Sequence, residues 1–291
     1  MADDPLITRR ELVHRGVSDS EIRRALRSGS ISSVRRGCFV GSGVMADVSP
    51  EARHLLCARA VLSAGGSDLV LSHESAALHW GLPLIGGPPH KVHVTATSGR
   101  RGRVDADRYL HSHSLSPVDL TTHDLICVTT LARTVVDLAC SLSFEAAVCA
   151  GDAASAEDAD LREALQRCGR RAGIARARRV ADFVDRASES VGESRSRVYF
   201  DRHGLPRPRL QTEIVVDGRV YRPDFLWDTV IGEFDGMVKY TGGGEATESV
   251  MVAEKLREDA LRAAGWRVVR WTWKDLADDR LAQRIRAALS A

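Results

Sequence analysis

The sequence predicts a multidomain chain of mixed α+β and α/β class, on three observations. Its 291 residues, 44% of them hydrophobic, are enough for two or three separate cores. Helix-capping sequences and β-branched runs both occur along the chain, so neither structure type dominates. The N-terminal stretch is rich in arginine, whereas the C-terminal stretch places carboxylates among strand-forming residues. We place the domain boundaries at residues 1–45, 46–150, 151–187 and 188–291.

The first 40 residues have the pattern of a helix-turn-helix with a wing. Two capping boxes, Thr8-Arg-Arg-Glu11 and Ser18-Asp-Ser-Glu21, each predict the start of a short helix, and Gly16 separates the two helices. Residues 29–40 then have the pattern of a β-hairpin with paired arginines at its tip. Two short helices followed by a hairpin predict a winged helix-turn-helix domain, which is a DNA-binding unit.

Positive charge is concentrated in this same segment. Between Arg9 and Arg36 there are eight arginines and three acidic residues, although the whole chain has a formal net charge of only +2. Arginines on the second helix would reach base edges or phosphates of double-stranded DNA, and those of the hairpin would follow the backbone or a minor groove. The alternative is that they are the solvated faces of a small structural helical pair. The candidate DNA-binding residues are Arg9, Arg10, Arg23, Arg24, Arg27, Arg35 and Arg36.

The N-terminal segment also resembles a known family. Residues 6–12, 16–18 and 35–40 are similar to the N-terminal winged-helix domain of the AbiEi antitoxins of bacterial abortive-infection toxin–antitoxin pairs. The resemblance implies a transcriptional repressor that binds inverted repeats in its own promoter, an arrangement that favours a homodimer. It also implies a partner, because in AbiEi-like proteins a C-terminal part neutralises a nucleotidyltransferase toxin.

The middle region is predicted to be α/β. We expect helices over residues 50–62, 71–83 and 131–140 and a strand over residues 91–97. Ser72, His73 and Glu74 are adjacent, so they cannot take up the geometry of a hydrolase triad, and we expect a capping or core role for them. His111 and His113, with His90 and His93 nearby, are candidate metal ligands, but no cysteine or carboxylate spacing supports them.

Two further basic stretches are open to two interpretations each. Residues 100–103 form either a phosphate contact or a solvated turn. Residues 152–187 form a helical connector, and the part between Arg167 and Arg179 contains six arginines and no acidic residue. Such a block is typical of a solvated linker or of a surface that faces nucleic acid.

The C-terminal region is predicted to place two carboxylates on neighbouring strands. Residues 209–216 and 219–227 are expected to form antiparallel strands joined by a tight turn at Asp217-Gly218, with a third strand over residues 230–234. Asp224 and Glu233 would then lie on adjacent strands. Two carboxylates in a partly buried site repel each other unless a cation lies between them, and Mg²⁺ is the cation that oxygen ligands of this kind prefer. The alternative is neutralisation by Arg222 or Lys239.

This region resembles the PD-(D/E)XK nucleases, in particular those similar to very-short-patch-repair endonucleases. The resemblance covers about the last hundred residues: Asp224, then eight residues, then Glu233-Phe-Asp235-Gly, with an opening helix at Ser190–Arg197 whose Glu193 can reach the metal. Helix 254–264 and strand 266–273 complete the order of a restriction-endonuclease-like core. Glu193 is also the last residue of a Ser-x-x-Glu capping box, and Asp235-Gly236 is also a turn sequence.

One position departs from that family pattern. Asp235 stands where the nucleases have a lysine, and the nearest lysines are Lys239 and Lys255. The candidate catalytic residues are Glu193, Asp224, Glu233, Asp235, Lys239 and Lys255, with Asp224 and Glu233 as the Mg²⁺ ligands. We therefore expect a DNA-binding regulator of antitoxin type with a degenerate nuclease-like domain. The alternatives are an active Mg²⁺-dependent DNA endonuclease in repair or phage defence, and a protein-interaction module that its arginines merely solubilise.

Composition gives the expected compartment. The six cysteines show none of the zinc-ligand spacings, the first residues are acidic, and no run of about 18 apolar residues occurs. We therefore expect a reduced, cytoplasmic chain with no membrane partner.

Overall fold

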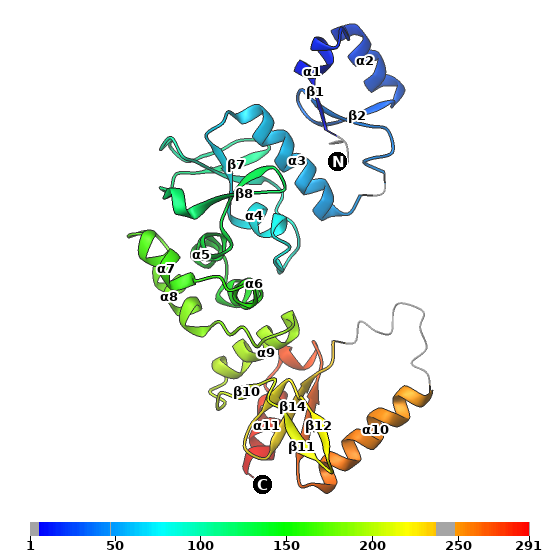
Figure 1. Cartoon of the computed structure of the whole chain (residues 1–291), viewed down its shortest axis with the longest axis vertical. Coiled ribbons are helices and arrows are strands. Elements are labelled where there is room, and N and C mark those ends of the chain that lie inside the picture. Colours follow the sequence, from blue (N-terminus) through cyan, green and yellow to red (C-terminus); the bar gives the residue numbers. More distant parts are fainter. Residues whose placement is uncertain (1–5, 47, 237–247, 291) are drawn as a thin grey trace. The chain divides into compact units, whose positions relative to one another are not determined.

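The structure is a computed structural model that describes residues 6–46, 48–236 and 248–290; the side chains of residues 248–255 lie outside the description (Figure 1). It divides into two compact units, Met1–Ala150 with Asp158–Asp182, and Gly151–Glu157 with Phe183–Ala291. Helices and mixed sheets occur in both units, which confirms the predicted α+β class. Within the described residues, no helix has the length and apolar character to cross a membrane.

The chain begins with two short helices and a three-stranded sheet. These elements are β1 Ile7–Thr8, α1 Arg9–His14, α2 Asp19–Ser28, β2 Ile31–Arg35 and β3 Cys38–Gly41, with sheet order β1-β3-β2. Both predicted capping boxes are confirmed: Thr8 N donates to Glu11 Oε2 at 2.7 Å, and Ser18 N donates to Glu21 Oε2 at 2.8 Å. The two helices and the hairpin therefore lie where the sequence predicted them, and their identity as a winged helix stays a prediction.

A six-stranded sheet forms the middle of the first unit. Its strands follow the order β6-β7-β5-β4-β9-β8. Their bounds are β4 Leu69–Leu71, β5 Val92–Ala96, β6 Arg103–Val104, β7 Arg108–His111, β8 Leu120–His123 and β9 Ile126–Thr129. The flanking helices are α3 Pro50–Gly65, α4 His73–His79, α5 Leu131–Ser141, α6 Phe144–Ala156, α7 Leu161–Arg167 and α8 Ile174–Phe183, with a 3-10 turn at Pro117–Asp119.

One predicted boundary in this region is wrong. The sequence predicted a helix over residues 71–83, but Leu71 ends a buried strand and the helix spans only His73–His79. The run Leu69-Val70-Leu71 is fully apolar and pairs with β5, so its burial in the sheet decides its conformation. Ser72 occupies the N-cap position between the strand and the helix.

The two faces of the six-stranded sheet differ in chemistry. Val92, Val94 and Ala96 of β5 belong to an apolar cluster that includes Ala58 and Val61 of α3. Side chains alternate between faces along a strand, so His93 and Thr95 lie on the opposite face. Tyr109 and His111 of β7 pair with His93 and Thr95, which extends this polar face onto the neighbouring strand.

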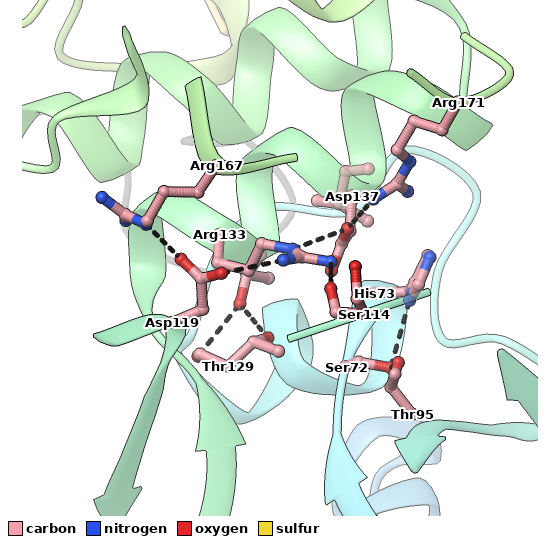
Figure 2. A network of polar contacts seen from close by, with 12 residues as sticks. Ser72, His73, Thr95, Ser114, Asp119, Thr129, Arg133, Asp137, Arg167 and Arg171 are labelled. Atoms are coloured by element: carbon pink, nitrogen blue, oxygen red, sulfur yellow. Dashed lines mark hydrogen bonds and ion pairs between the residues drawn. The ribbon is translucent and has the colours of Figure 1, made fainter. Parts of the chain in front are cut away.

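A buried ionic network connects the 3-10 turn that precedes β8 with helix α5, with the end of α7 and with the segment after it (Figure 2). Arg133, whose exposed fraction is 1%, lies between Asp119 at 2.9 Å and Asp137 at 3.1 Å. Arg167 contacts Asp119 at 2.8 Å, and Arg171 contacts Asp137 at 2.6 Å. Each buried carboxylate therefore has two guanidinium partners, because a charge removed from water is tolerated only when it is paired.

This network changes the interpretation of the arginine-rich segment. Neither a solvated linker nor a nucleic-acid surface accounts for Arg167 and Arg171, because both contact buried carboxylates. Arg176 donates from Nε to the carbonyl oxygen of Ala139 at 2.8 Å, near the end of α5. Only part of the segment, including Arg170 and Arg178, is exposed. Much of its positive charge is therefore structural.

The second unit contains a four-stranded sheet of order β10-β13-β14-β15 and a separate hairpin, β11-β12. The strands are β10 Arg209–Leu210, β11 Ile214–Val216, β12 Arg219–Tyr221, β13 Phe225–Leu226, β14 Val230–Phe234 and β15 Arg267–Trp271. The helices are α9 Val191–Arg202, α10 Glu248–Ala263 and α11 Arg280–Ser290, with a 3-10 turn at Asp275–Ala277. Asp217 and Gly218 have φ angles of 50° and 72°, which confirms the predicted turn. The two long strands predicted around that turn are each broken into two short ones.

We predict that replacing Arg133 will strongly destabilise the first unit. Arg133→Met leaves two buried carboxylates each with one partner fewer, which should lower the free energy of unfolding by about 3–5 kcal/mol. The exposed Arg178→Met is the matched control and should change it by less than about 0.5 kcal/mol. Denaturant unfolding followed by circular dichroism measures both variants, and equal stability of the two would contradict the prediction.

Candidate functional site

The start of β13 holds a cluster of polar side chains contributed by three elements. Ser190 caps α9 by accepting from Glu193 N at 3.1 Å, and its hydroxyl donates to Glu193 Oε1 at 2.8 Å. Ser190 is therefore the N-cap as predicted, but the Glu193 carboxylate accepts from Glu189 N at 3.0 Å rather than from Ser190 N, so the predicted capping box is incomplete. Glu193 Oε2 accepts from Gln211 Nε2 at 3.0 Å, so the same carboxylate also faces the end of β10. Glu193 is only 5% exposed.

A close approach between α9 and β14 sets the position of Glu193. Gly192 precedes it, and a Cβ atom at Gly192 would come within 2.0 Å of the ring of Phe234. The absence of a side chain therefore lets the first turn of α9 lie directly against β14. This gives a packing reason for the Val-Gly-Glu sequence at the start of the helix.

Asp224 lies just before β13 and is partly buried. Its Oδ2 accepts from Phe234 N of β14 at 2.9 Å, and its Oδ1 accepts from Gln211 Nε2 at 3.4 Å. Burial raises the pKa of Asp224 above its usual value, and the carboxylate of Glu193 raises it further, whereas the hydrogen bond from Phe234 opposes the shift. The surroundings of Asp224 therefore disfavour its ionised form.

Gln211 is the residue of this cluster that the sequence did not reveal. It has a φ angle of 48°, in the left-handed region that residues other than glycine seldom adopt. Its backbone N donates to the carbonyl oxygen of Asp224 at 3.2 Å, and its side-chain amide lies between Glu193 and Asp224. The amide hydrogens thus occupy the position that a cation between the two carboxylates would take. A strained backbone at such a point is a common feature of functional sites.

Glu233, the other predicted metal ligand, faces arginine instead. Its two carboxylate oxygens lie 3.0 Å from Arg257 of α10 and 3.0 Å from Arg270 of β15. Glu233 and Arg270 are direct partners in the parallel pairing of β14 with β15. Of the predicted neutralising residues, Arg222 binds Glu189 at 2.8 Å and Lys239 lies outside the described residues. Neutralisation of Glu233 thus comes from two arginines that the sequence did not single out.

The remaining predicted catalytic residues are Asp235, Lys239 and Lys255. Asp235 is exposed, and its backbone N donates to the carbonyl oxygen of Trp271 at 2.8 Å. Lys239 lies outside the described residues, and Lys255 lies in α10 with its side chain outside the description. Their catalytic roles stay predictions.

The carboxylates of Asp224 and Glu193 are arranged as ligands of a hard divalent cation, whereas that of Glu233 is not. Asp224 and Glu193 both offer carboxylate oxygens around Gln211, as Mg²⁺ requires, and Asp224 is ionised at an energetic cost that a cation would remove. Glu233 would have to leave its two arginines to take part. If Mg²⁺ binds, these residues would hold it, and it would polarise a phosphate and activate a bound water.

The predicted DNA-binding arginines separate into exposed and paired ones. Arg10, Arg23, Arg24, Arg27 and Arg36 are exposed. By contrast, Arg9 binds Asp19 at 2.6 Å, in a pair that is itself exposed.

Arg35 has a different position. Its Nε lies 2.7 Å from Asp107 Oδ2, and its Nη1 donates to the carbonyl oxygen of Ala60 at 3.3 Å. Arg35 therefore connects the hairpin to the middle of the first unit, and the exposed cationic side chain of the arginine pair is Arg36.

Comparisons with known proteins identify relatives of undefined function. No protein-family model matches the chain. Uncharacterized proteins MT2308 and Rv2248, from two strains of Mycobacterium tuberculosis, are each 35% identical to it over 122 residues, which is 40% of this chain and 43% of theirs. The chain thus spans less than half the length of these relatives. The crystal structure of the RV2827C protein from Mycobacterium tuberculosis aligns with 73% of this chain and 84% of its own, at 17% identity and a TM-score of 0.46.

We predict that Asp224→Asn will stabilise the second unit at neutral pH. The folded-state pKa of Asp224 is raised, so its ionised form weakens folding, while asparagine keeps an oxygen that can accept from Phe234 N. The gain should be on the order of 1 kcal/mol near pH 7. It should vanish below the unfolded pKa of about 3.9, where Asp224 is neutral in both states.

Unfolding measured at several pH values tests this. The exposed Asp228→Asn serves as the control that removes the same charge from the adjacent loop. A loss of stability in Asp224→Asn of the same size at every pH would contradict the prediction.

Proposed function

We propose that this chain is a DNA-binding transcriptional regulator of antitoxin type whose C-terminal domain is nuclease-like and degenerate. The observation that carries the proposal is the surface of α2. Ile22 is buried and Leu26 half-buried on one side of the helix, while Arg23, Arg24 and Arg27 are exposed. An exposed basic face on the second of two capped helices is what a recognition helix requires.

The spacing of these arginines supports contact with a duplex. Arg23 and Arg27 are four residues apart, so they lie on one stripe of the helix, with Arg24 beside them. A guanidinium group can bind a phosphate or the edge of a guanine with two hydrogen bonds. Arg36 at the tip of the hairpin adds a cation that can follow the DNA backbone.

The pairing of Glu233 supports a degenerate rather than an active C-terminal site. A carboxylate already neutralised by Arg257 and Arg270 attracts a metal cation weakly, because binding would require breaking both ion pairs. A regulator of this type would bind inverted repeats as a homodimer. Its C-terminal part would bind a nucleotidyltransferase-type toxin, as the family resemblance implies.

A second candidate function is an active Mg²⁺-dependent DNA endonuclease. It is favoured by Asp224 and Glu193, which approach the same amide without a guanidinium between them. In this alternative the exposed arginines would direct cleavage to DNA rather than repress transcription.

We predict that DNA binding by this chain depends strongly on salt concentration. The chain should bind the DNA upstream of its own gene with an affinity that falls steeply with salt, because each phosphate contact releases counterions. Replacing Arg23, Arg24 and Arg27 together by alanine should weaken binding and reduce the slope of log affinity against log salt by about one for each lost phosphate contact. Fluorescence anisotropy across salt concentrations measures both quantities.

A matched control distinguishes a specific surface from general charge. Replacing Arg219, Arg280 and Arg286 removes the same charge from exposed positions of the second unit and should leave the slope unchanged. Arg36→Ala should weaken binding directly, whereas Arg35→Ala should chiefly destabilise the protein because it breaks the pair with Asp107. A flat salt response of the wild-type chain would refute the proposal.

Cleavage of plasmid DNA distinguishes the two proposed functions. Because Glu233 is held by arginine, the wild-type chain should not nick supercoiled plasmid in the presence of Mg²⁺ or Mn²⁺. Metal-dependent nicking that disappears in Asp224→Ala and persists in Asp228→Ala would instead establish the endonuclease.

A further inference from the structure

The polar face of the six-stranded sheet gathers four histidines. His73 begins α4, directly after β4, His93 lies in β5, and His111 ends β7, with His113 two residues further. β4, β5 and β7 are consecutive neighbours in the sheet, which explains how residues 40 positions apart meet. Figure 2 shows His73 beside Ser72, below the ionic network of Arg133 and Asp137.

The ring of His111 lies next to the other three rings. One ring nitrogen from each of His73, His111 and His113 lies within 4.8 Å of the others. The rings of His73 and His111 stack with centroids 3.5 Å apart, and His111 Nε2 lies 3.3 Å from His93 Nδ1. His73 is 2% exposed, while His111 and His113 are half-buried, so the cluster is open on one side.

The carboxylate of Glu74 lies next to His93 of the cluster. Glu74 Oε2 lies 2.8 Å from His93 Nδ1, the same nitrogen that faces His111. In a zinc site the outer-shell carboxylate usually accepts from the ligating imidazole itself. Here Glu74 lies against His93, and His93 in turn lies against His111. Glu74 and Asp137 supply negative charge near the rings, and Arg171 and Arg133 supply positive charge that opposes a cation.

From this geometry we propose that His73, His111 and His113 bind a transition-metal ion of the zinc class, with His93 and Glu74 orienting His111. Three imidazole nitrogens are donors that Zn²⁺ prefers, whereas Mg²⁺ prefers oxygen ligands. Burial of His73 disfavours a charged ring, and the neutral imidazole is the form that metal ligation requires.

Binding requires a small rearrangement. Ligand nitrogens in a tetrahedral zinc site lie about 3.3 Å apart. Nitrogens that lie within 4.8 Å of one another must therefore approach by up to about 1.5 Å, and the stacked pair must open. Rotation of the half-buried His113 and of His111 about their side-chain bonds provides this movement. Three imidazoles leave a fourth position for water or for a ligand.

A second cluster is the natural comparison. His79, His123 and Asp124 also place ligand atoms within 4.8 Å of one another. The Asp124 side chain is 72% exposed and that of His123 is 42% exposed, so this group is more open to solvent than the first cluster, whose His73 is 2% exposed. We therefore place the metal at the first cluster.

The test uses the full chain, free of affinity tags and stripped of metal. Titration with Co²⁺ should give the absorption bands of a tetrahedral site at one ion per chain, and Zn²⁺ should displace it. His111→Ala and His113→Ala should each weaken binding by at least about tenfold. His123→Ala should bind like the wild type, and so should Asp224→Ala, which removes the predicted Mg²⁺ ligand of the second unit.

Melting curves provide the control for folding. Zn²⁺ should raise the melting temperature of the wild type and not that of His113→Ala, whose metal-free melting temperature should be unchanged because its ring is half-buried. Absence of Co²⁺ bands, wild-type affinity in His113→Ala, or loss of binding in His123→Ala would each overturn the proposal.

Discussion

Compensation of buried carboxylates is the physical constraint on which both units depend. A carboxylate removed from water must be paired, and this chain uses arginine for the purpose. Arg133 joins Asp119 and Asp137 in the first unit, and Arg197 holds Asp152 at 2.6 Å in the second. Asp224 is an exception to this use of arginine, because its carboxylate accepts hydrogen bonds from the amide of Gln211 and from the backbone N–H of Phe234.

That contrast separates structural from functional charge. Arginines that complete buried pairs cannot meet a ligand without weakening the fold, so the arginine-rich segment exposes less positive charge than its composition suggests. The exposed arginines of α2 do not complete buried pairs of this kind. The same reasoning applies to carboxylates: Glu233 is satisfied, while Asp224 retains an unfavourable ionised state that a ligand can relieve.

Local signals in the sequence predicted much of the fold because they act over a few residues. The capping boxes of α1 and α2 and the Asp217-Gly218 turn are decided by contacts three or fewer residues apart, and each is confirmed. The boundary at Leu71 could not be found in this way, because a short apolar run suits a strand or a buried helix equally. Its pairing with a distant strand decides between them.

The site was less predictable because its contacts are long-range. The motif placed Asp224 and Glu233 on neighbouring strands. In the structure Asp224 lies just before β13, whose Phe225 pairs with Gly232 of β14, the strand that carries Glu233. The motif could not reveal that Glu233 would face Arg270, which depends on the parallel register of β14 with β15. Arg35 pairs with a carboxylate 72 positions away, a contact that no local pattern predicts. The histidine cluster likewise depends on strand order rather than on spacing along the chain.

We propose that the N-terminal helices and hairpin bind a duplex and that the second unit has a different role. Hydrogen exchange followed by mass spectrometry, with and without a bound duplex, tests this assignment most directly. The account predicts that DNA will slow exchange over residues 19–41, which include α2 and the hairpin, and will leave the strands around Asp224 unchanged. Protection confined to the second unit, with residues 19–41 exchanging as in the free protein, would contradict it.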